Sequence, residues 1–421
     1  MIGFAVILLL LLLAIGTHVG IAMGITAVII LWLEGLPMAV VSQNALKTVD
    51  SYALVAVPFF ILAGELMMKG RIADILVALI GSIVRVIRGG LALTVMLGCV
   101  FFAAVSGSSV ASAAAIGKSS VSILSDDGYP RRFAAGIVAV GGTLGLMIPP
   151  SLTFILIGSM IGLPIDRLFI AGILPGILEA LVLAVVATLI ARRRGYGTTL
   201  PRPDWRLFGR SFGPALPAMM FPVLIIGTIY GGIFTPTEVS AVAATYAACL
   251  CLFVYRTANL RAVWAACKST ALASGMIYLI VIGGSLLAFV LTRIGFADQL
   301  TGMAQAANME PWMFLIAVNI VLLVLGMFVD GVSLIVLTAP TLFQMAPHFD
   351  VNPIHLAVIM TANVEIATLT PPVGLNLFVM SGIARLPVEQ VIRGVLPFYL
   401  ARLVALVCIT FIPWISLALV G

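Results

Sequence analysis

Long apolar segments follow one another along the whole chain, and several of them reach the ~20 residues that a helix needs to cross a lipid bilayer. None of them alternates between apolar and polar positions with the period of two that a membrane β-strand requires. Segments 3–14 and 21–33 predict a first span or pair of spans, and segment 51–68 predicts the next one. The pattern therefore predicts an all-α polytopic membrane protein.

Three shorter segments carry charges near their ends. In segment 71–88 the apolar residues recur at the spacing of one helix face, as Ile72, Ile75, Leu76 and Leu79 show. This amphipathic spacing predicts a helix that lies along the membrane interface. Segments 259–268 and 296–307 have a related character. We expect all three to be short helices that brace a scaffold.

Two apolar runs are interrupted by adjacent prolines, Pro149 with Pro150 and Pro371 with Pro372. Proline lacks a backbone N–H group, so a helix broken at such a pair leaves carbonyl oxygens without partners. At membrane depth these carbonyls are tolerated only where protein or a water-filled cavity covers them. Broken helices are therefore predicted at 131–162 and 353–385, each with a candidate ion or substrate site at the break.

The offset between the two proline pairs recurs elsewhere in the chain. It also relates Gly172 and Pro175 to Gly394 and Pro397. A collinear series of such matches predicts a duplicated unit. We expect a first repeat at 1–195, a linker at 196–211 and a second repeat at 212–421.

Each repeat contains a pair of apolar arms that are too short to span the membrane. The arms within 89–126 flank a Gly/Ser cluster at 106–109, and those within 311–346 flank Asp330 and Gly331. Arms of about 15 residues predict re-entrant hairpins rather than two full spans. The rest of the two repeats is assigned to scaffold helices at 1–88 and 212–308 and to single spans at 166–192 and 388–419.

Composition and charge agree with a membrane protein and give its orientation. Apolar residues make up 62% of the chain and charged residues 9%. Cytoplasmic loops are enriched in Lys and Arg. The basic residues at and before the linker therefore predict that it lies in the cytoplasm. The two repeats then have opposite topology, with both termini in the periplasm. The basic residues that indicate this are Arg192, Arg193, Arg194, Arg202, Arg206 and Arg210.

Oxygen-bearing side chains gather at the predicted hairpin tips and helix breaks, where hard cations such as sodium would find ligands. The hydroxyl groups are those of Ser106, Ser108, Ser109, Thr143, Ser333, Thr368 and Thr370. Helix N-termini suit a carboxylate, and carbonyls at helix C-termini suit a small cation. The sequence thus predicts a site that takes both kinds of ion.

Asp330 is a carboxylate within an apolar stretch, which is costly unless the residue is paired or functional. It could serve the site or cap a helix, and the two roles are compatible. Candidate contacts for an anionic substrate are Ser108, Thr153, Asp330 and Asn376. Lys118 could face the cavity or extend its amine to the membrane surface. Four glutamates are predicted to pair with basic groups or cap helices: Glu65, Glu179, Glu238 and Glu365.

Motifs of the common enzyme classes are missing. Gly117, Lys118 and Ser119 resemble the end of a phosphate-binding loop, but Ser112 stands where that motif needs its first glycine. The chain is therefore not expected to be an enzyme. A receptor without transport activity would need no paired helix breaks.

Several stretches resemble the large membrane subunit, of the DctM type, of the tripartite ATP-independent periplasmic (TRAP) transporters. They are VPFFILAGELM at 57–67, AVSGSSVASAAAIG at 104–117, GGTLGLMIPPS at 141–151, FTPTEVSAVA at 234–243 and PPVGLNLFV at 371–379. The resemblance covers nearly the whole chain. It implies an inverted-repeat, elevator-type transporter of the bacterial inner membrane, driven by a sodium gradient and similar in fold to the sodium-coupled ion transporter superfamily.

The resemblance also implies two partners, a small four-helix membrane subunit and a periplasmic protein that delivers organic acids. Because the chain begins at the first span, we expect the small subunit to be a separate chain. The sodium-binding regions of the family correspond here to Ser106, Ser109, Gly145, Ile148, Gly331, Ser333, Thr368 and Thr370.

The predicted function is sodium-driven import of a C4-dicarboxylate, a sialic acid or a keto acid. Sodium would pre-organise the hairpin tips, so that substrate affinity is high only with ions bound. The alternative is a proton-coupled carrier of organic anions, with Asp330 as the proton relay.

Overall fold

The computed structural model describes residues 2–70, 72–199 and 202–420, and within these ranges all regular structure is helical. Among the described residues, seven helical segments are long and apolar enough to cross a membrane, which confirms the predicted all-α polytopic class. They are Tyr52–Lys69, Ile165–Arg194, Trp205–Tyr230, Pro236–Val254, Leu260–Arg293, Gly331–Phe349 and Val388–Phe411. Arg71 of the predicted interfacial helix and positions 200 and 201 of the predicted linker lie outside the described residues.

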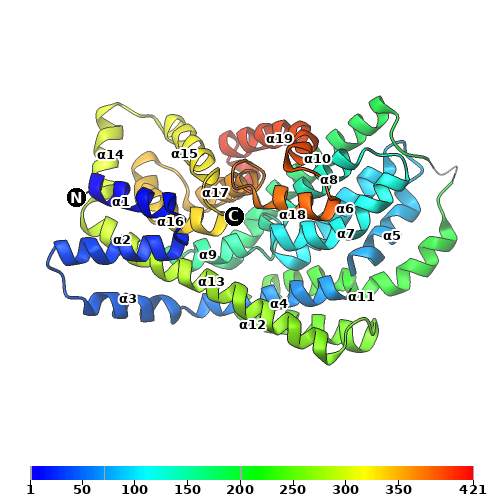
Figure 1. Ribbon diagram of the computed structural model, residues 1–421, viewed down its shortest axis with the longest axis horizontal. Coiled ribbons are helices and arrows are strands. Elements are labelled where there is room, and N and C mark those ends of the chain that lie inside the picture. The colour runs from blue at the N-terminus through cyan, green and yellow to red at the C-terminus, as the bar shows by residue number, and fades with distance from the viewer. Residues whose placement is uncertain (1, 71, 200–201, 421) are drawn as a thin grey trace.

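One layer of the molecule consists of helices from the beginning of each half of the chain (Figure 1). Its central member is α13 (Leu260–Arg293), which packs along three helices of the first half. These neighbours are α2 (Val19–Leu33), α3 (Ala39–Val49) and α4 (Ala56–Lys69). The layer is completed by α12 (Pro236–Cys249), which packs on α4, and by α11 (Trp205–Tyr230). We call this set the α13 layer.

The prediction of a separate short helix at 259–268 is wrong, because this segment forms the first turns of α13. Asn259 caps the helix, with its Oδ1 accepting a hydrogen bond from the Ala262 N–H at 2.9 Å. No proline follows within the helix, so nothing stops it before Arg293. Segment 296–306 does form a short helix of its own, α14 (Phe296–Ala306).

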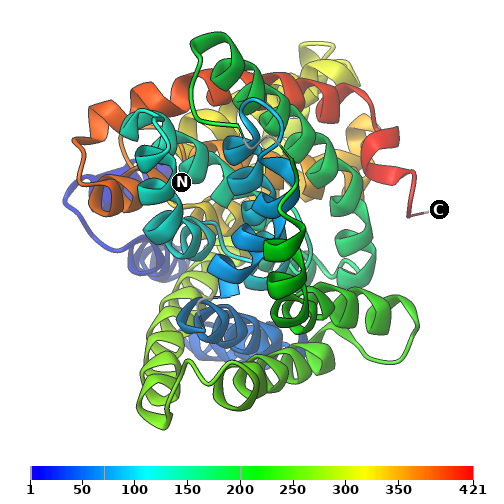
Figure 2. The ribbon, with the colours of Figure 1, turned by 90° about the vertical axis from the view of Figure 1, so that its right-hand side faces the viewer.

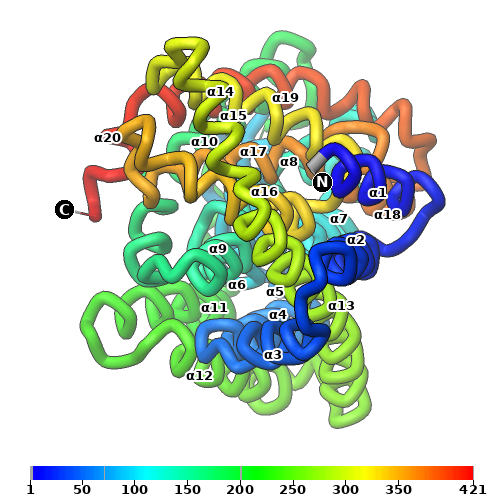
Figure 3. The backbone as a smooth tube through the Cα atoms, turned by 90° about the vertical axis from the view of Figure 1, so that its left-hand side faces the viewer, coloured from blue at the N-terminus to red at the C-terminus, as the bar shows by residue number. Residues whose placement is uncertain are grey.

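The second layer contains the hairpins and the broken helices (Figure 3). From the first half it takes α6 (Gly90–Ser106), α7 (Ser109–Asp126), α8 (Arg131–Thr143), α9 (Leu152–Ile161) and α10 (Ile165–Arg194). From the second half it takes α15 (Pro311–Gly326), α16 (Gly331–Met345), α17 (Pro353–Ala367), α18 (Leu375–Ala384) and α19 (Val388–Phe411). We call this set the hairpin layer.

The remaining elements connect or edge the two layers. The amphipathic α5 (Ile72–Val84) lies between α6 and α11 at one end of the molecule (Figure 2). The first and last helices along the chain are α1 (Ile2–Ala14) and α20 (Trp414–Leu417). Short turns complete the fold: η1 (Tyr52–Val55), η2 (Leu144–Leu146), η3 (Leu250–Val254) and η4 (Ala346–Phe349).

Both proline pairs interrupt a helix. In the first half α8 ends at Thr143, and the chain passes through η2 and the pair Pro149 and Pro150 before α9 begins. In the second half α17 ends at Ala367, and α18 begins only after Pro371 and Pro372. Proline cannot supply the N–H groups that would continue the upstream helix, which explains why both breaks fall there.

Within the hairpin layer α8 and α19 cross at two glycines. A Cβ atom at Gly394 would lie 1.9 Å from the carbonyl oxygen of Arg132, and one at Gly136 would lie 2.4 Å from the carbonyl carbon of Gly394. The obstructing atoms belong to the backbone, so a small side-chain movement cannot relieve the contact. Only glycine fits this crossing.

Replacing Gly394 with Ala is therefore expected to lower the unfolding free energy by at least the ~1–3 kcal/mol typical of overpacking. Thermal unfolding of the purified protein in detergent measures the effect. The matched control is Gly227→Ala in α11, where a Cβ would meet no atom within 4 Å. That variant should be as stable as the wild type or slightly more stable, because Ala favours helix. Equal melting temperatures for the two variants would contradict the crossing described here.

Candidate functional site

A cavity of about 350 Å³ lies between the α13 layer and the hairpin layer. The α13 layer contributes Glu65 and Met68 from α4 and Ala273 and Ile277 from α13. The hairpin layer contributes most of the residues that the sequence predicts for the site. Those that line the cavity are Ser106, Ser108, Ser109, Thr153, Asp330, Gly331 and Thr368.

Four helices begin at this central cavity. The first residues of α7, α9, α16 and α18 are Ser109, Leu152, Gly331 and Leu375, and all four line it. Helix N-termini present free N–H groups and a partial positive charge. The cavity can therefore stabilise an anion without a cationic side chain in its wall.

The first hairpin tip is bonded to the first helix break. Gly107 has a positive φ of 60°, and a Cβ there would lie 2.5 Å from the carbonyl oxygen of Pro150. The Leu152 N–H donates to the Gly107 carbonyl at 3.4 Å. Within the tip the hydroxyls of Ser106 and Ser112 are 2.6 Å apart, and Ser106 also donates to the Ser108 carbonyl at 3.2 Å. The hairpin tip and the break thus form one hydrogen-bonded unit.

The second half repeats this arrangement. The Val373 N–H, just after the second proline pair, donates to the carbonyl of Met327 at the end of α15 at 3.1 Å. Thr368 and Thr370 donate their hydroxyls back to the carbonyls of Glu365 and Ile366 at 2.8 and 2.7 Å. In both halves a helix break is therefore joined to the hairpin of the same half.

Asp330 is the N-cap of α16, as the capping alternative predicts. Its Oδ1 accepts hydrogen bonds from the Val332 and Ser333 N–H groups at 3.0 and 3.1 Å, and its Oδ2 accepts from the Ser333 hydroxyl at 2.5 Å. It also lines the central cavity. No Lys, Arg or His of the described residues forms an ion pair with it. Asp330 thus places an uncompensated negative charge beside the four helix N-termini.

Five predicted site residues lie behind the cavity wall. Ser333 bonds to Asp330, and Thr370 bonds to Ile366 and, at 3.2 Å, to the Tyr399 hydroxyl. Asn376 is fully buried, and its Nδ2 donates to Ser109 Oγ at 2.7 Å and to the Ala139 carbonyl at 2.9 Å. The remaining two pack against neighbouring segments, Gly145 against Ser108 and Ile148 against Gly176.

A buried charge cluster lies elsewhere in the hairpin layer. Arg402 of α19 pairs with Glu179 of α10 at 2.5 Å and with Glu365 of α17, and it also donates to the hydroxyl of Thr143 on α8. All three charged residues are at most 1% exposed. The prediction that Glu179 and Glu365 pair with a basic group is confirmed. Arg402 was not predicted from the sequence, although a single arginine within the apolar run 394–411 is a signal of this kind.

The other two glutamates have polar partners. Glu238 and Thr235 form a capping box at the start of α12, with the Thr235 N–H donating to Glu238 at 2.8 Å, as the capping prediction requires. Glu65 accepts a hydrogen bond from the Ser269 hydroxyl at 3.3 Å.

A family model described as "Tripartite ATP-independent periplasmic transporter, DctM component" matches residues 6–415. The chain belongs to this family. The C4-dicarboxylate TRAP transporter large permease protein DctM of Pseudomonas aeruginosa is 41% identical over 377 residues, which are 89% of this chain and 87% of that protein. The sialic acid TRAP transporter large permease protein SiaM of Vibrio cholerae is 32% identical over 378 residues, 90% of this chain and 88% of that protein.

The fold is also similar to a solved structure. The YdaH transporter of Alcanivorax borkumensis, whose crystal structure shows an unusual topology, aligns with a TM-score of 0.61 at 14% identity. The alignment covers 90% of this chain and 88% of that chain. At this identity the likeness shows the fold alone.

Membership of the TRAP family confirms three predictions from the sequence: the resemblance, the class of multi-pass membrane protein and the absence of an enzymatic role. The chain is a large permease of a tripartite transporter.

Lys118, whose role the sequence leaves open, lines a separate cavity of about 430 Å³ with Lys69 and Asp74. Met68 borders both this cavity and the central one.

Proposed function

We propose that this chain carries an organic acid across the bacterial inner membrane, driven by a sodium gradient. The observation that carries the proposal is the convergence of four helix N-termini and Asp330 on one cavity between two layers. The hairpin layer would move as an elevator against the α13 layer and present the cavity to each side in turn. The bonds between each hairpin tip and its helix break support movement of that layer as a unit.

The coupling follows from the charges around the cavity. Asp330 repels an incoming carboxylate as long as its own charge is not compensated. A sodium ion held near it would remove this repulsion, and the helix N-termini would then favour the anion. Sodium would thus bind first and raise the affinity for the acid. The proposed sodium-binding regions are Ser106, Ser109, Gly145, Ile148, Gly331, Ser333, Thr368 and Thr370.

The substrate would contact Ser108 and Thr153 directly, since both line the cavity. Asp330 would act on it through the bound sodium, and Asn376 would act by holding Ser109 in place. The names of the relatives support an organic acid, and C4-dicarboxylates, sialic acids and keto acids all carry the carboxylate that the helix N-termini favour.

The proposed partners are a small four-helix membrane subunit and a periplasmic binding protein. The α13 layer offers the membrane subunit an apolar outer face, with exposed residues such as Val223, Trp264 and Leu272. We place both chain termini in the periplasm and the connection between α10 and α11 in the cytoplasm, because Arg192, Arg193 and Arg194 end α10.

Uptake of labelled succinate and N-acetylneuraminate by cells that express all three components tests this function. Each component is omitted in turn. Uptake of at least one acid should require all three. Equal uptake without this chain would overturn the proposal.

Replacing Ser109 with Ala is expected to raise the sodium concentration for half-maximal uptake about tenfold. This is the effect of losing ~1.4 kcal/mol of the binding free energy of sodium. Folding should survive, because Asn376 retains its bond to the Ala139 carbonyl. The matched control is Ser125→Ala on the same helix, whose hydroxyl bonds to the Val121 carbonyl. Unchanged sodium dependence in Ser109→Ala, with normal expression, would count against Ser109 as a ligand.

A further inference from the structure

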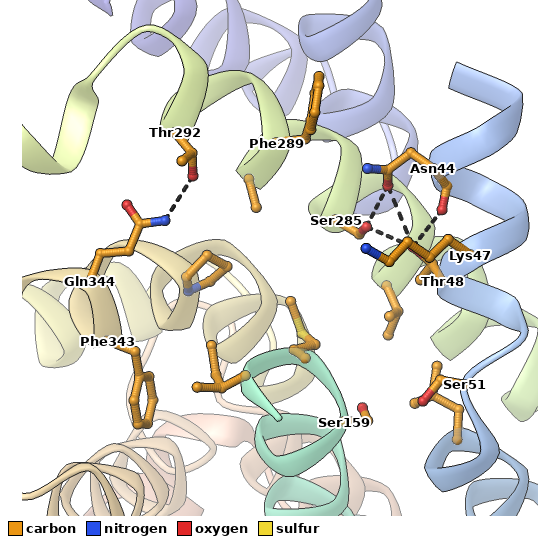
Figure 4. A pocket seen from close by; sticks show the side chains of 16 residues that line it. Asn44, Lys47, Thr48, Ser51, Ser159, Ser285, Phe289, Thr292, Phe343 and Gln344 are labelled. Atoms are coloured by element: carbon orange, nitrogen blue, oxygen red, sulfur yellow. Dashed lines mark hydrogen bonds between the residues drawn. The ribbon is translucent and has the colours of Figure 1, made fainter. Parts of the chain in front are cut away.

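A second polar cavity, of about 490 Å³, lies between the two layers (Figure 4). It is lined from the α13 layer by α3 and α13 and from the hairpin layer by α9 and α16. Its polar residues include Asn44, Lys47, Thr48, Ser285, Thr292 and Gln344. We call it the Lys47 cavity. No prediction from the sequence concerns it.

The Lys47 cavity and the central cavity lie at opposite ends of the same helices. Both α9 and α16 begin at the central cavity, with Leu152 and Gly331, and end at the Lys47 cavity, with Ile161 and Gln344. The ten residues of α9 span roughly 15 Å at ~1.5 Å per residue. Because α13 lines both cavities as well, the Lys47 cavity is the next hollow along the interface between the layers.

Of the described residues that line this cavity, Lys47 alone is ionisable. In the part of the chain that the structure describes, no carboxylate forms an ion pair with it. Figure 4 shows its side chain reaching into the cavity from α3. The cavity therefore has a net positive charge with no internal counter-ion.

The neutral groups beside Lys47 are held in place by hydrogen bonds. The Ser285 hydroxyl donates to Asn44 Oδ1 at 2.6 Å, and the hydroxyls of Thr48 and Ser285 are 2.6 Å apart (Figure 4). Since the Asn44 carbonyl oxygen is the acceptor in this bond, its amide nitrogen remains a donor beside the Lys47 amine. An ammonium group with a fixed amide donor is suited to a carboxylate.

We propose that the Lys47 cavity is a second binding site for the carboxylate of the transported acid, occupied on the way to or from the central cavity. This inference rests on the proposed function. The cavity would bind an anion of either kind, a substrate carboxylate or the phosphate of a lipid headgroup. The experiment below separates these two ligands.

The test compares Lys47→Gln and Lys47→Arg in proteoliposomes that hold the complete transporter, at saturating sodium and with a range of succinate and N-acetylneuraminate concentrations. Lys47→Gln should raise the half-saturating concentration of the transported acid about tenfold, as expected for one lost charge-assisted hydrogen bond. Lys47→Arg should restore most of the affinity. In a separate titration of sodium at a fixed acid concentration, the half-saturating sodium concentration should not change in either variant. The matched control is Lys268→Gln, which removes a lysine near the start of α13, whereas the α13 residues that line the Lys47 cavity lie near its end. This variant should behave as the wild type.

A binding readout without transport completes the test. A cysteine introduced by Ser51→Cys lines the same cavity, and its alkylation by N-ethylmaleimide should slow when the acid is added without any ion gradient. Because the chain has cysteines of its own, among them the exposed Cys249, the label on residue 51 is followed by mass spectrometry of the peptide that contains it. This protection should be lost in the Ser51→Cys, Lys47→Gln double variant.

The outcomes separate this inference from the proposed function. If the wild type transports no organic acid, the proposed function fails. If the wild type transports but Lys47→Gln has unchanged affinity and the acid gives no protection, the second site does not exist. A Lys47→Gln defect that appears in vesicles containing phosphatidylglycerol and vanishes in pure phosphatidylcholine would assign the anion to a lipid and overturn the inference.

Discussion

The Arg402→Met variant is expected to lose ~3–5 kcal/mol of stability, because it leaves two carboxylates inside the protein without their cation. Arg402 connects three other helices of the hairpin layer through Glu179, Glu365 and Thr143, and its side chain is 1% exposed. Oε1 of Glu365 already has no hydrogen-bond partner within the described residues. Thermal unfolding in detergent should show a markedly lower transition temperature and a poor yield of monodisperse protein.

Two further variants show whether the unpaired buried charges cause the loss of stability in Arg402→Met. Arg393→Met on the same helix removes an exposed arginine and should change the stability little. The triple variant Arg402→Met, Glu179→Gln, Glu365→Gln removes all three charges and should recover much of the loss, since uncharged groups are less costly to bury. A melting temperature for Arg402→Met that equals that of Arg393→Met would contradict the buried cluster.

The Asp330→Asn variant is expected to fold normally and to need much more sodium for transport. Asparagine caps helices as well as aspartate does, so the hydrogen bonds to the Val332 and Ser333 N–H groups can persist. What disappears is the negative charge of Asp330 itself, while Glu65 remains in the wall of the central cavity. The half-saturating sodium concentration should rise by roughly 10- to 100-fold, the range for ~1.5–3 kcal/mol of a charge-assisted interaction.

The sodium dependence of this variant distinguishes the two coupling hypotheses. If sodium is the coupling ion, raised sodium should restore part of the uptake. If Asp330 is a proton relay, uptake should stay low at every sodium concentration. The matched control is Asp298→Asn, which neutralises an exposed carboxylate in the first turn of α14 and should leave uptake unchanged.

The sequence predicts most accurately those features that a local signal determines. The prolines at 149–150 and 371–372 remove backbone donors wherever the chain places them, so both helix breaks could be located. The turn at Ser106 to Ser109 and the cap at Asp330 are local in the same sense, because glycine, serine and aspartate favour such positions. Several residues of the central cavity could therefore be named in advance.

Features that depend on distant contacts could not be predicted. The bond between Asn376 and Ser109 joins residues 267 positions apart, and nothing near Asn376 indicates its partner. The same holds for Arg402 and Glu179, and for Lys47, whose cavity forms only when α3 meets α9 and α16.

The wrong prediction of a separate short helix at 259–268 has another cause. Arg261 and Lys268 suggest a helix end, but such side chains can reach the membrane surface from within a long helix.

The most direct test of sodium-coupled transport uses liposomes that contain this chain and its small subunit, with the binding protein and a labelled organic acid outside. Uptake is compared under an imposed sodium gradient and under an imposed proton gradient. Sodium coupling predicts uptake that requires both the sodium gradient and the binding protein. Uptake driven by the proton gradient in the absence of sodium would contradict it and make Asp330 the centre of the mechanism.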